Sequence, residues 1–169
     1  MVKLIFLTGM PGSGKSTTGK LLATKLGYAF IDLDHEIEKT KSKSIRHIFA
    51  DEGEDAFRLF EHESLVKLIE EIKNNTVISL GGGTVAFHNN LELVKKAGKL
   101  IYLEVKQPIL TERLKNQTSN RPLFQATDPE LKINLLLALR ERYYRQAHIL
   151  VDANGKAEDV AEKITELIG

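Results

Sequence analysis

Short apolar runs alternate along this chain with longer stretches in which apolar residues recur at helical spacing. The short runs are rich in β-branched and aromatic residues and occupy positions 3–8, 28–32, 76–80, 99–105 and 148–152. Several are apolar almost throughout, which is typical of parallel strands covered on both faces. Strands and helices that alternate in this way predict an α/β sandwich with right-handed crossover connections.

Three helices are predicted from apolar residues spaced three or four apart. The first begins after Glu54 and carries Phe57, Phe60, Leu65, Leu68, Ile69 and Ile72. The second is defined by Leu131, Leu135, Leu136, Leu139 and Tyr143, with Asp128 as N-cap and Pro129 in the first turn. The third closes the chain with Val160, Ile164, Leu167 and Ile168. The polar stretch 115–128 is the predicted mobile loop.

The composition is that of one globular domain over residues 1–169. Apolar residues make up 42% of the chain and charged residues 28%, and the net charge is +1, which gives no reason to expect a nucleic-acid or membrane partner. The chain has no cysteine, which excludes disulfides, thiolate zinc sites and cysteine nucleophiles. Neither a signal peptide nor a run of about 20 apolar residues is present, so we expect a cytoplasmic protein.

Residues 9–16 read Gly-Met-Pro-Gly-Ser-Gly-Lys-Ser and fit the pattern G-x-x-x-x-G-K-[ST] at every constrained position. The segment lies between the apolar run 3–8 and a helical stretch, which is the context of a phosphate-binding P-loop. Glycines let backbone N–H groups converge on phosphate oxygens, and the helix N-terminus adds positive potential. Lys15 is therefore expected on the β- and γ-phosphates of ATP, and the Ser16 hydroxyl on Mg²⁺.

Pro11 has no N–H, so the phosphate donors begin at Gly12. The predicted ATP-binding residues of this loop are Gly12, Ser13, Gly14, Lys15, Ser16 and Thr17. A regulatory GTPase would also need an Asn-Lys-x-Asp motif to read guanine, and the chain has none. The pattern therefore favours an ATP-dependent kinase that acts on a small second substrate, rather than a switch protein.

Two carboxylates, Asp32 and Asp34, end the second apolar run. Ligands of open α/β sheets bind at the carboxyl ends of strands, and alternation puts both side chains on one side if the strand continues. We expect Asp32 to bind Mg²⁺, because Ser79 stands where many P-loop proteins carry an acidic metal ligand. Asp34 is expected to orient a substrate hydroxyl or take its proton. The alternative is that Asp34 only caps the next helix.

Arg58 and Glu61 are neighbours on the first predicted helix, so Glu61 can hold the guanidinium in place. The alternative is an ordinary surface ion pair. Gly81, Gly82 and Gly83 follow the run 76–80 and allow a backbone to pass close to a ligand and to offer its N–H groups. Here the alternative is a turn without function.

Several arginines occur late in the chain. Arg121 lies in the polar loop, from which it could close over the γ-phosphate and neutralise charge in the transition state; the alternative is a solvated side chain. Arg140 lies one turn before Tyr144 and keeps helical spacing with the apolar series Leu136, Leu139 and Tyr143, which places it at the margin of the core. Its neighbours Arg142 and Arg145 are expected to face solvent.

Taken together in order, these motifs resemble those of shikimate kinases over residues 4 to about 152. The matching set is the P-loop, Asp32-x-Asp34, Ser44-Ile45 with Phe49, Gly53-Glu54, Phe57-Arg58-x-x-Glu61, Gly81-Gly82-Gly83, Arg121-Pro122-Leu123 and Arg140-x-x-x-Tyr144. The resemblance implies a three-layer α/β/α P-loop kinase fold, with a five-stranded parallel sheet in the order 2-3-1-4-5. It also implies transfer of the γ-phosphoryl group of ATP to the 3-hydroxyl of shikimate, by a monomeric enzyme.

The resemblance also assigns roles to individual residues. Asp34 would bind the ring hydroxyls, Arg58 and Arg140 the carboxylate, and Gly82 would make a backbone contact, with region 33–60 binding substrate. Arg121 would be the arginine of a lid over 112–127, and Asp32 and Ser16 would bind Mg²⁺. Arg113 and the residues near 153–156, including Asn154, would flank adenine.

Pro11 departs from the pattern, because the P-loop of the resembling family usually has methionine at this position. Met-Pro-Gly-Ser-Gly-Lys-Ser is also similar to P-loops of nucleoside monophosphate kinases and gluconate kinases. These remain alternative functions on the same scaffold. They do not explain the triple glycine or Arg140-x-x-x-Tyr144.

Overall fold

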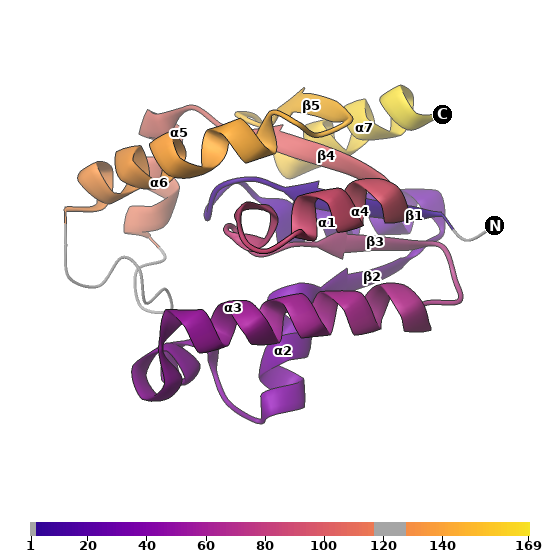
Figure 1. The fold of residues 1–169 in the computed structure, drawn as a ribbon. Coiled ribbons are helices and arrows are strands. Elements are labelled where there is room, and N and C mark those ends of the chain that lie inside the picture. The colour runs from indigo at the N-terminus through magenta and orange to yellow at the C-terminus, as the bar shows by residue number, and fades with distance from the viewer. Residues whose placement is uncertain (1–2, 117–127) are drawn as a thin grey trace.

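The computed structural model describes residues 3–116 and 128–169. Five strands form one parallel sheet in the order β2-β3-β1-β4-β5 (Figure 1). Their bounds are β1 Leu4–Thr8, β2 Ala29–Asp32, β3 Thr76–Ser79, β4 Lys99–Glu104 and β5 Ile149–Asp152. All five predicted strands and the predicted strand order are confirmed.

Helices connect successive strands and cover both faces of the sheet. They are α1 Lys15–Leu26, α2 Leu33–Lys41, α3 Ile45–Glu71, α4 Asn90–Ala97, α5 Gln107–Lys115, α6 Pro129–Tyr144 and α7 Ala157–Ile168, with a short 3₁₀ helix, η1, at Thr84–Ala86. The chain moves from β1 to β2 in one direction along the sheet and from β2 through β5 in the other. Right-handed crossovers therefore place α1 on one face and the later connections on the opposite face. Helix α7 returns to pack against α1, which completes three layers.

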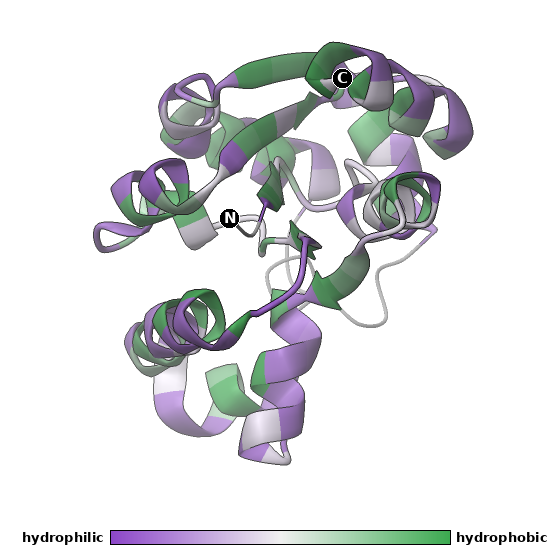
Figure 2. Ribbon diagram, turned by 90° about the vertical axis from the view of Figure 1, so that its right-hand side faces the viewer, coloured by the Kyte–Doolittle hydropathy of each residue, from purple (hydrophilic) through white to green (hydrophobic). Residues whose placement is uncertain are grey.

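The core lies on the central strands. All five residues of β1 and all four of β3 are buried, whereas the edge strands β2 and β5 are partly exposed. The strands are coloured mostly as hydrophobic in Figure 2, while the helices alternate between hydrophobic and hydrophilic residues. This distribution confirms that the apolar runs of the central strands β1 and β3 are parallel strands covered on both sides.

Helix α3 extends further toward the N-terminus than predicted. Ser44 caps its N-terminus, and its hydroxyl accepts a hydrogen bond from the backbone N–H of His47. The helical stretch is interrupted at Gly53, whose φ of 85° and ψ of 174° form a kink. The predicted helix after Glu54 is thus the longer part of α3, beyond the kink.

The predicted caps of α6 are confirmed, but its predicted buried face is wrong. Asp128 accepts a hydrogen bond from the backbone N–H of Glu130, and Pro129 lies in the first turn. Three of the leucines expected in the core are exposed: Leu131 by 54%, Leu135 by 53% and Leu139 by 65%. The buried side chains are instead Ile133, Leu136, Arg140 and Tyr144. The predicted placement of Arg140 beside Leu136 at the core is confirmed, whereas Leu139 lies on the exposed side of the helix.

None of the helices within residues 3–116 and 128–169 is both long enough and apolar enough to cross a membrane.

Candidate active site

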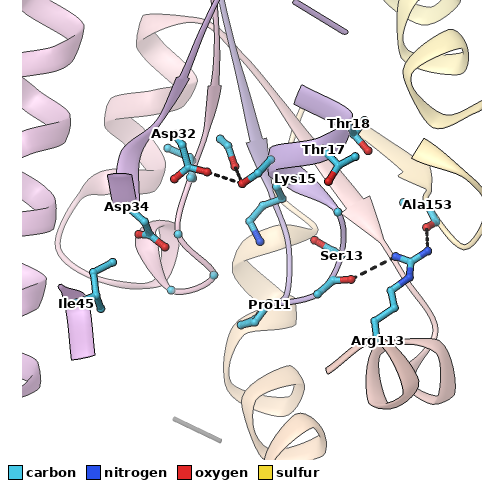
Figure 3. Close-up of a pocket in the computed structure, with 18 of the residues that line it drawn as sticks. Pro11, Ser13, Lys15, Thr17, Thr18, Asp32, Asp34, Ile45, Arg113 and Ala153 are labelled. Carbon is cyan, nitrogen blue, oxygen red and sulfur yellow. Dashed lines mark hydrogen bonds between the residues drawn. The ribbon is translucent and has the colours of Figure 1, made fainter. Parts of the chain in front are cut away.

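A cavity of about 950 Å³ opens at the carboxyl ends of β1, β2 and β3. The P-loop forms its floor, and residues of α2, α3, α5, α6 and the segment after β3 form its walls. Figure 3 shows Asp34 and Arg113 on opposite sides of the P-loop, with Lys15 between them. The cavity therefore has two ends, one near Asp34 and one near Arg113, and it is large enough for two small ligands.

The P-loop adopts backbone conformations that favour glycine. Gly12 has a φ of 83° and Gly14 a φ of 90°, in the left-handed region where a side chain is strained. Helix α1 begins directly after Gly14, so its positive end lies at the loop. Lys15 is 9% exposed, and its Nζ donates to the carbonyl oxygens of Gly9 at 2.9 Å and Met10 at 3.0 Å. The loop thus has the form of a phosphate cradle with the lysine held across it.

Ser16 and Asp32 meet at the cavity floor, where the Ser16 hydroxyl donates to Oδ2 of Asp32. The Ser79 hydroxyl lies 3.4 Å from that of Ser16. Hydroxyl and carboxylate oxygens are the donors that Mg²⁺ prefers, and Mg²⁺ in kinases usually takes only one or two protein ligands beside phosphate oxygens and water. These two residues fit a magnesium ion beside the P-loop. Among the described residues there is no group of three or more acidic or histidine side chains that could hold a metal alone.

The structure corrects two expectations about Asp34. Strand β2 ends at Asp32 and α2 begins at Leu33, so the alternation argument does not apply. Asp34 is also not the helix cap: Asp32 caps α2, and its Oδ1 accepts from the backbone N–H of His35 at 3.3 Å. Asp34 lies instead in the first turn of α2 and lines the cavity. The capping alternative for Asp34 is therefore wrong.

Asp34 has an unusual electrostatic environment. Its Oδ1 is shielded from solvent and has no hydrogen-bond partner within the described parts of the chain. Burial, followed by the negative charges of Glu61 and Asp32, raises its pKa from 3.8 to about 7, although Lys15 and Arg58 oppose the shift. A carboxyl group with a pKa near neutrality can exchange a proton with a substrate at physiological pH.

The pair of Arg58 and Glu61 is buried, so the surface alternative is wrong. The two side chains are 4% and 0% exposed, and Arg58 Nη1 donates to Glu61 Oε1 at 2.9 Å. Arg58 also pairs with Glu54 at 3.2 Å, and its guanidinium lies 4.2 Å from the ring centroid of Phe87. These contacts fix the guanidinium in one orientation at the cavity wall.

Each glycine of the run after β3 packs against a residue of the cavity. A Cβ on Gly81 would lie 2.7 Å from Glu61 Oε2, a Cβ on Gly82 would lie 2.7 Å from the ring of Pro11, and a Cβ on Gly83 would lie 2.6 Å from Arg58 Nη2. Real Cβ atoms essentially never approach other atoms so closely. The run is therefore glycine because the backbone passes directly against Glu61, the P-loop and Arg58.

Arg140 and Tyr144 lie on the buried face of α6. Arg140 is 5% exposed and lines the cavity. The Tyr144 hydroxyl donates to the carbonyl oxygen of Gly82, and its ring stacks on that of Tyr102 at 5.1 Å. Burial raises the pKa of Tyr144 to about 12 despite the charge of Arg140, so this hydroxyl keeps its proton. Arg142 and Arg145 are exposed, as predicted.

The other end of the cavity is defined by Arg113. Its guanidinium donates to the carbonyl oxygens of Gly12, Ala153, Asn154 and Gly155 at 3.3–3.4 Å. The side chain of Asn154 is not part of this cavity: it bonds to the N–H of Lys106 and to Asp152 and borders a smaller cavity. The predicted lid arginine, Arg121, and residues 117–127 lie outside the described residues.

Sequence reasoning missed residues that line or support the cavity. Glu38 lines it, and Thr84 hydrogen-bonds to Glu61 behind it. Glu38 carries no local signal, because it looks like an ordinary helix residue. A polar residue directly after three glycines could have indicated Thr84.

Known proteins similar to this chain share both its sequence and its fold. The family model described as shikimate kinase matches residues 11–169. A shikimate kinase from Chlorobium chlorochromatii is 44% identical, and the alignment covers 95% of this chain and 90% of that protein.

Two solved structures extend the comparison. A shikimate kinase from Acinetobacter baumannii in complex with shikimate aligns with a TM-score of 0.93 at 38% identity, over 99% of this chain and 93% of the other. Shikimate kinase from Bacteroides thetaiotaomicron aligns with a TM-score of 0.91 at 36% identity, over 98% of each chain. With the strand order and P-loop described above, these similarities confirm the expected P-loop kinase fold. The chain therefore belongs to the shikimate kinase family.

Proposed function

We propose that this chain transfers the γ-phosphoryl group of ATP to the 3-hydroxyl of shikimate, giving shikimate 3-phosphate and ADP. The observation that carries the proposal is the combination, in one cavity, of a P-loop with two buried arginines and Asp34. Arginines recognise a carboxylate through paired N–H donors, and a carboxyl group reads hydroxyls. The cavity thus fits a small anionic polyol beside a triphosphate.

ATP would occupy the end of the cavity near Arg113. The residues proposed to bind its phosphates are Gly12, Ser13, Gly14, Lys15, Ser16 and Thr17, all of which line the cavity. Arg113, with the loop around Asn154, is proposed to flank adenine, and Arg121 to contact the γ-phosphate. Ser16 and Asp32 would hold Mg²⁺, which supplies positive charge to the phosphate oxygens when it is bound.

Shikimate would occupy the end near Asp34, between α2–α3 and α6. In this proposal Arg58 and Arg140 bind its carboxylate, and the run 81–83 lies against its ring. The proton of the 3-hydroxyl passes to Asp34 while its oxygen bonds to the γ-phosphorus and the bond from that phosphorus to ADP breaks. Asp34 suits this step because its pKa of about 7 lets it accept a proton at neutral pH.

The proposal includes the wider predictions made from the sequence. Region 33–60 would form the wall of the shikimate site, residues 112–127 would act as a lid, and the enzyme would be a monomer in the cytoplasm. The cavity lining supports the first of these, because Asp34, Glu38, Ile45, Phe49, Phe57 and Arg58 all contribute to it.

A coupled assay of ADP release tests the function directly. The enzyme is supplied with ATP and Mg²⁺ and then with shikimate, quinate, gluconate, AMP or CMP, so that the sugar-acid and nucleotide alternatives compete on equal terms. We expect turnover with shikimate that stops when EDTA removes Mg²⁺ and returns when Mg²⁺ is restored. Turnover with AMP or gluconate but not with shikimate would overturn the proposal.

The variant Lys15→Met separates catalysis from nucleotide binding alone. The substitution removes the cation expected on the β- and γ-phosphates and should abolish most of the shikimate-dependent turnover. A protein that only binds nucleotide has no turnover in the unaltered form, so its Lys15→Met variant would show no loss.

A further inference from the structure

A chain of buried polar side chains runs behind the cavity wall, away from the P-loop. Glu61 and Thr84 are both 0% exposed, as is Asn90 at the start of α4. The Thr84 hydroxyl donates to Glu61 Oε2 at 2.7 Å, and the Asn90 side-chain amide donates to the Thr84 carbonyl oxygen at 2.9 Å. These bonds join α3 to η1 and η1 to the start of α4. Such a network holds its members in fixed positions when every polar group is satisfied.

Glu61 is the link between this network and the cavity. Its Oε1 accepts from Arg58, and its Oε2 accepts from Thr84, so each carboxylate oxygen has a partner from a different element. A carboxylate held at both oxygens cannot rotate without breaking a buried hydrogen bond, which is costly. The plane of Glu61, and with it the direction from which it meets Arg58, is therefore set by Thr84.

The Thr84 hydroxyl lies close against the backbone that follows β3, together with carboxylate oxygens of Glu61 and Asp34. A Cβ on Gly81 would lie 3.0 Å from Thr84 Oγ1, 2.7 Å from Glu61 Oε2 and 3.0 Å from Asp34 Oδ1, so these three groups converge on one glycine. A Cβ on Gly83 would contact the Arg58 guanidinium. The same short segment thus carries Thr84 and bounds the space that Arg58 occupies.

We propose that Thr84 is a positioning residue for substrate binding: its hydroxyl orients Glu61, which in turn presets the Arg58 guanidinium for a carboxylate. This inference rests on the proposed function, in which Arg58 binds the carboxylate of shikimate. Asn90 supports the arrangement by holding the backbone of Thr84. The effect is to lower the cost of ordering Arg58 when the substrate enters.

Two substitutions separate the hydroxyl from the packing of the side chain. Thr84→Val keeps the shape but removes the donor, whereas Thr84→Ser keeps the donor and loses a methyl group. We expect Thr84→Val to raise the KM for shikimate about tenfold, because a buried acceptor on Glu61 is left unsatisfied and Arg58 loses its fixed orientation. The KM for ATP should stay within about twofold, since Thr84 acts through Arg58, which lines the cavity beside Asp34 and not beside Arg113. Thr84→Ser should behave like the unaltered protein.

A purely structural role for Thr84 predicts a different result. Thr84→Val would then lower the melting temperature but leave the KM for shikimate unchanged, or raise both KM values equally, and either outcome overturns the proposal. In an Arg58→Ala background, Thr84→Val should add little further to the KM for shikimate, because the group that it positions is gone. A full additional increase there would also contradict the proposal.

If Thr84→Val does not fold, the comparison of Thr84→Ala with Thr84→Ser makes the same test with the same expected outcomes. The activity of the unaltered protein distinguishes a failure of the proposed function from a failure of the role of Thr84 alone. An unaltered protein without shikimate-dependent ADP release overturns the proposed function, and the role of Thr84 falls with it. An active protein whose Thr84→Val variant has an unchanged KM for shikimate overturns only the role of Thr84.

Discussion

Asp34 is surrounded by groups that pull its protonation in opposite directions. Burial and the carboxylates of Glu61 and Asp32 favour the neutral form, while Lys15 and Arg58 favour the charged form. The groups that favour the neutral form outweigh the others, so the pKa of Asp34 rises to about 7. The environment that raises the pKa of Asp34 therefore lowers the stability of the folded protein when Asp34 is charged. The same raised pKa lets Asp34 accept a proton in the proposed reaction.

Asp34→Asn should stabilise the protein at high pH. Between pH 3.8 and about 7 the folded state holds the Asp34 proton more tightly than the unfolded state, so the free energy of unfolding falls as pH rises through this range. The rise of the Asp34 pKa from 3.8 to about 7 limits the loss of unfolding free energy over this range to about 4 kcal/mol. We expect Asp34→Asn to melt at a higher temperature than the unaltered protein at pH 8, with the gain shrinking toward pH 4.

Asp152 provides a control of opposite sign. The backbone N–H of Asn154 lowers the pKa of this exposed carboxylate, so Asp152 contributes stability above pH 3.8. Asp152→Asn should therefore lower the melting temperature at pH 8. The environment described for Asp34 would be contradicted if Asp34→Asn changed the melting temperature equally at pH 8 and pH 4.

The carboxylate clamp makes a prediction about Arg58. Arg58→Ala should raise the KM for shikimate at least tenfold while the KM for ATP changes little, because the guanidinium faces the Asp34 end of the cavity. Steady-state kinetics with each substrate varied in turn measure both values. Arg142→Ala, which removes an exposed arginine, is the control and should leave both unchanged. Equal increases in the two KM values for Arg58→Ala would argue against carboxylate binding.

At the scale of elements, α6 carries its functional residues on its buried face. Ile133 and Leu136 pack into the core along the same face as Arg140 and Tyr144. The burial of apolar residues thus holds a charged residue at the cavity wall. The exposed leucines of α6 contribute nothing to this placement, although they dominate its sequence pattern.

Two adjacent leucines of α6 test this orientation. Leu136 is 8% exposed and Leu135 is 53% exposed. Leu136→Ala should lower the free energy of unfolding by about 2–4 kcal/mol, because it leaves a cavity in the core. Leu135→Ala should change it by less than about 0.5 kcal/mol. Urea denaturation measures both values, and the reverse order would place the other face of α6 in the core.

Across the whole molecule, the cavity joins segments from nearly the entire chain. The P-loop follows β1, Asp34 lies on α2, Arg58 on α3, and Arg140 on α6, beyond the carboxyl ends of parallel strands. A ligand that contacts all of these elements binds the folded state and not the unfolded chain. Its binding free energy is therefore added to the stability of the whole fold.

Shikimate should consequently raise the melting temperature. At a concentration of 100 times its Kd the added stability is about 2.7 kcal/mol, which corresponds to a shift of roughly 5–10 °C for a domain of this size. Thermal unfolding with shikimate, and with gluconate as the comparison ligand, checks this value. A shift with gluconate and none with shikimate would favour the sugar-acid kinase alternative.

The sequence by itself determined the features that depend on neighbouring residues. The apolar runs predicted all five strands, and the spacing of residues 9–16 predicted the P-loop, because strand burial and phosphate binding each need a contiguous pattern. The start of α6 was also predictable, because the N-cap Asp128 and the first-turn residue Pro129 are adjacent in the sequence. The order of the strands came from the resemblance of the whole set of motifs.

The tertiary structure decided everything that depends on contacts between distant segments. Only the packing of α3 against η1 shows that the Arg58–Glu61 pair is buried and that Thr84 bonds to it. The pKa of Asp34 depends on charges from the P-loop and α3, and the buried face of α6 depends on its packing against α5, η1 and Tyr102. Burial and charge are properties of a site assembled in space, so no local pattern could have supplied them.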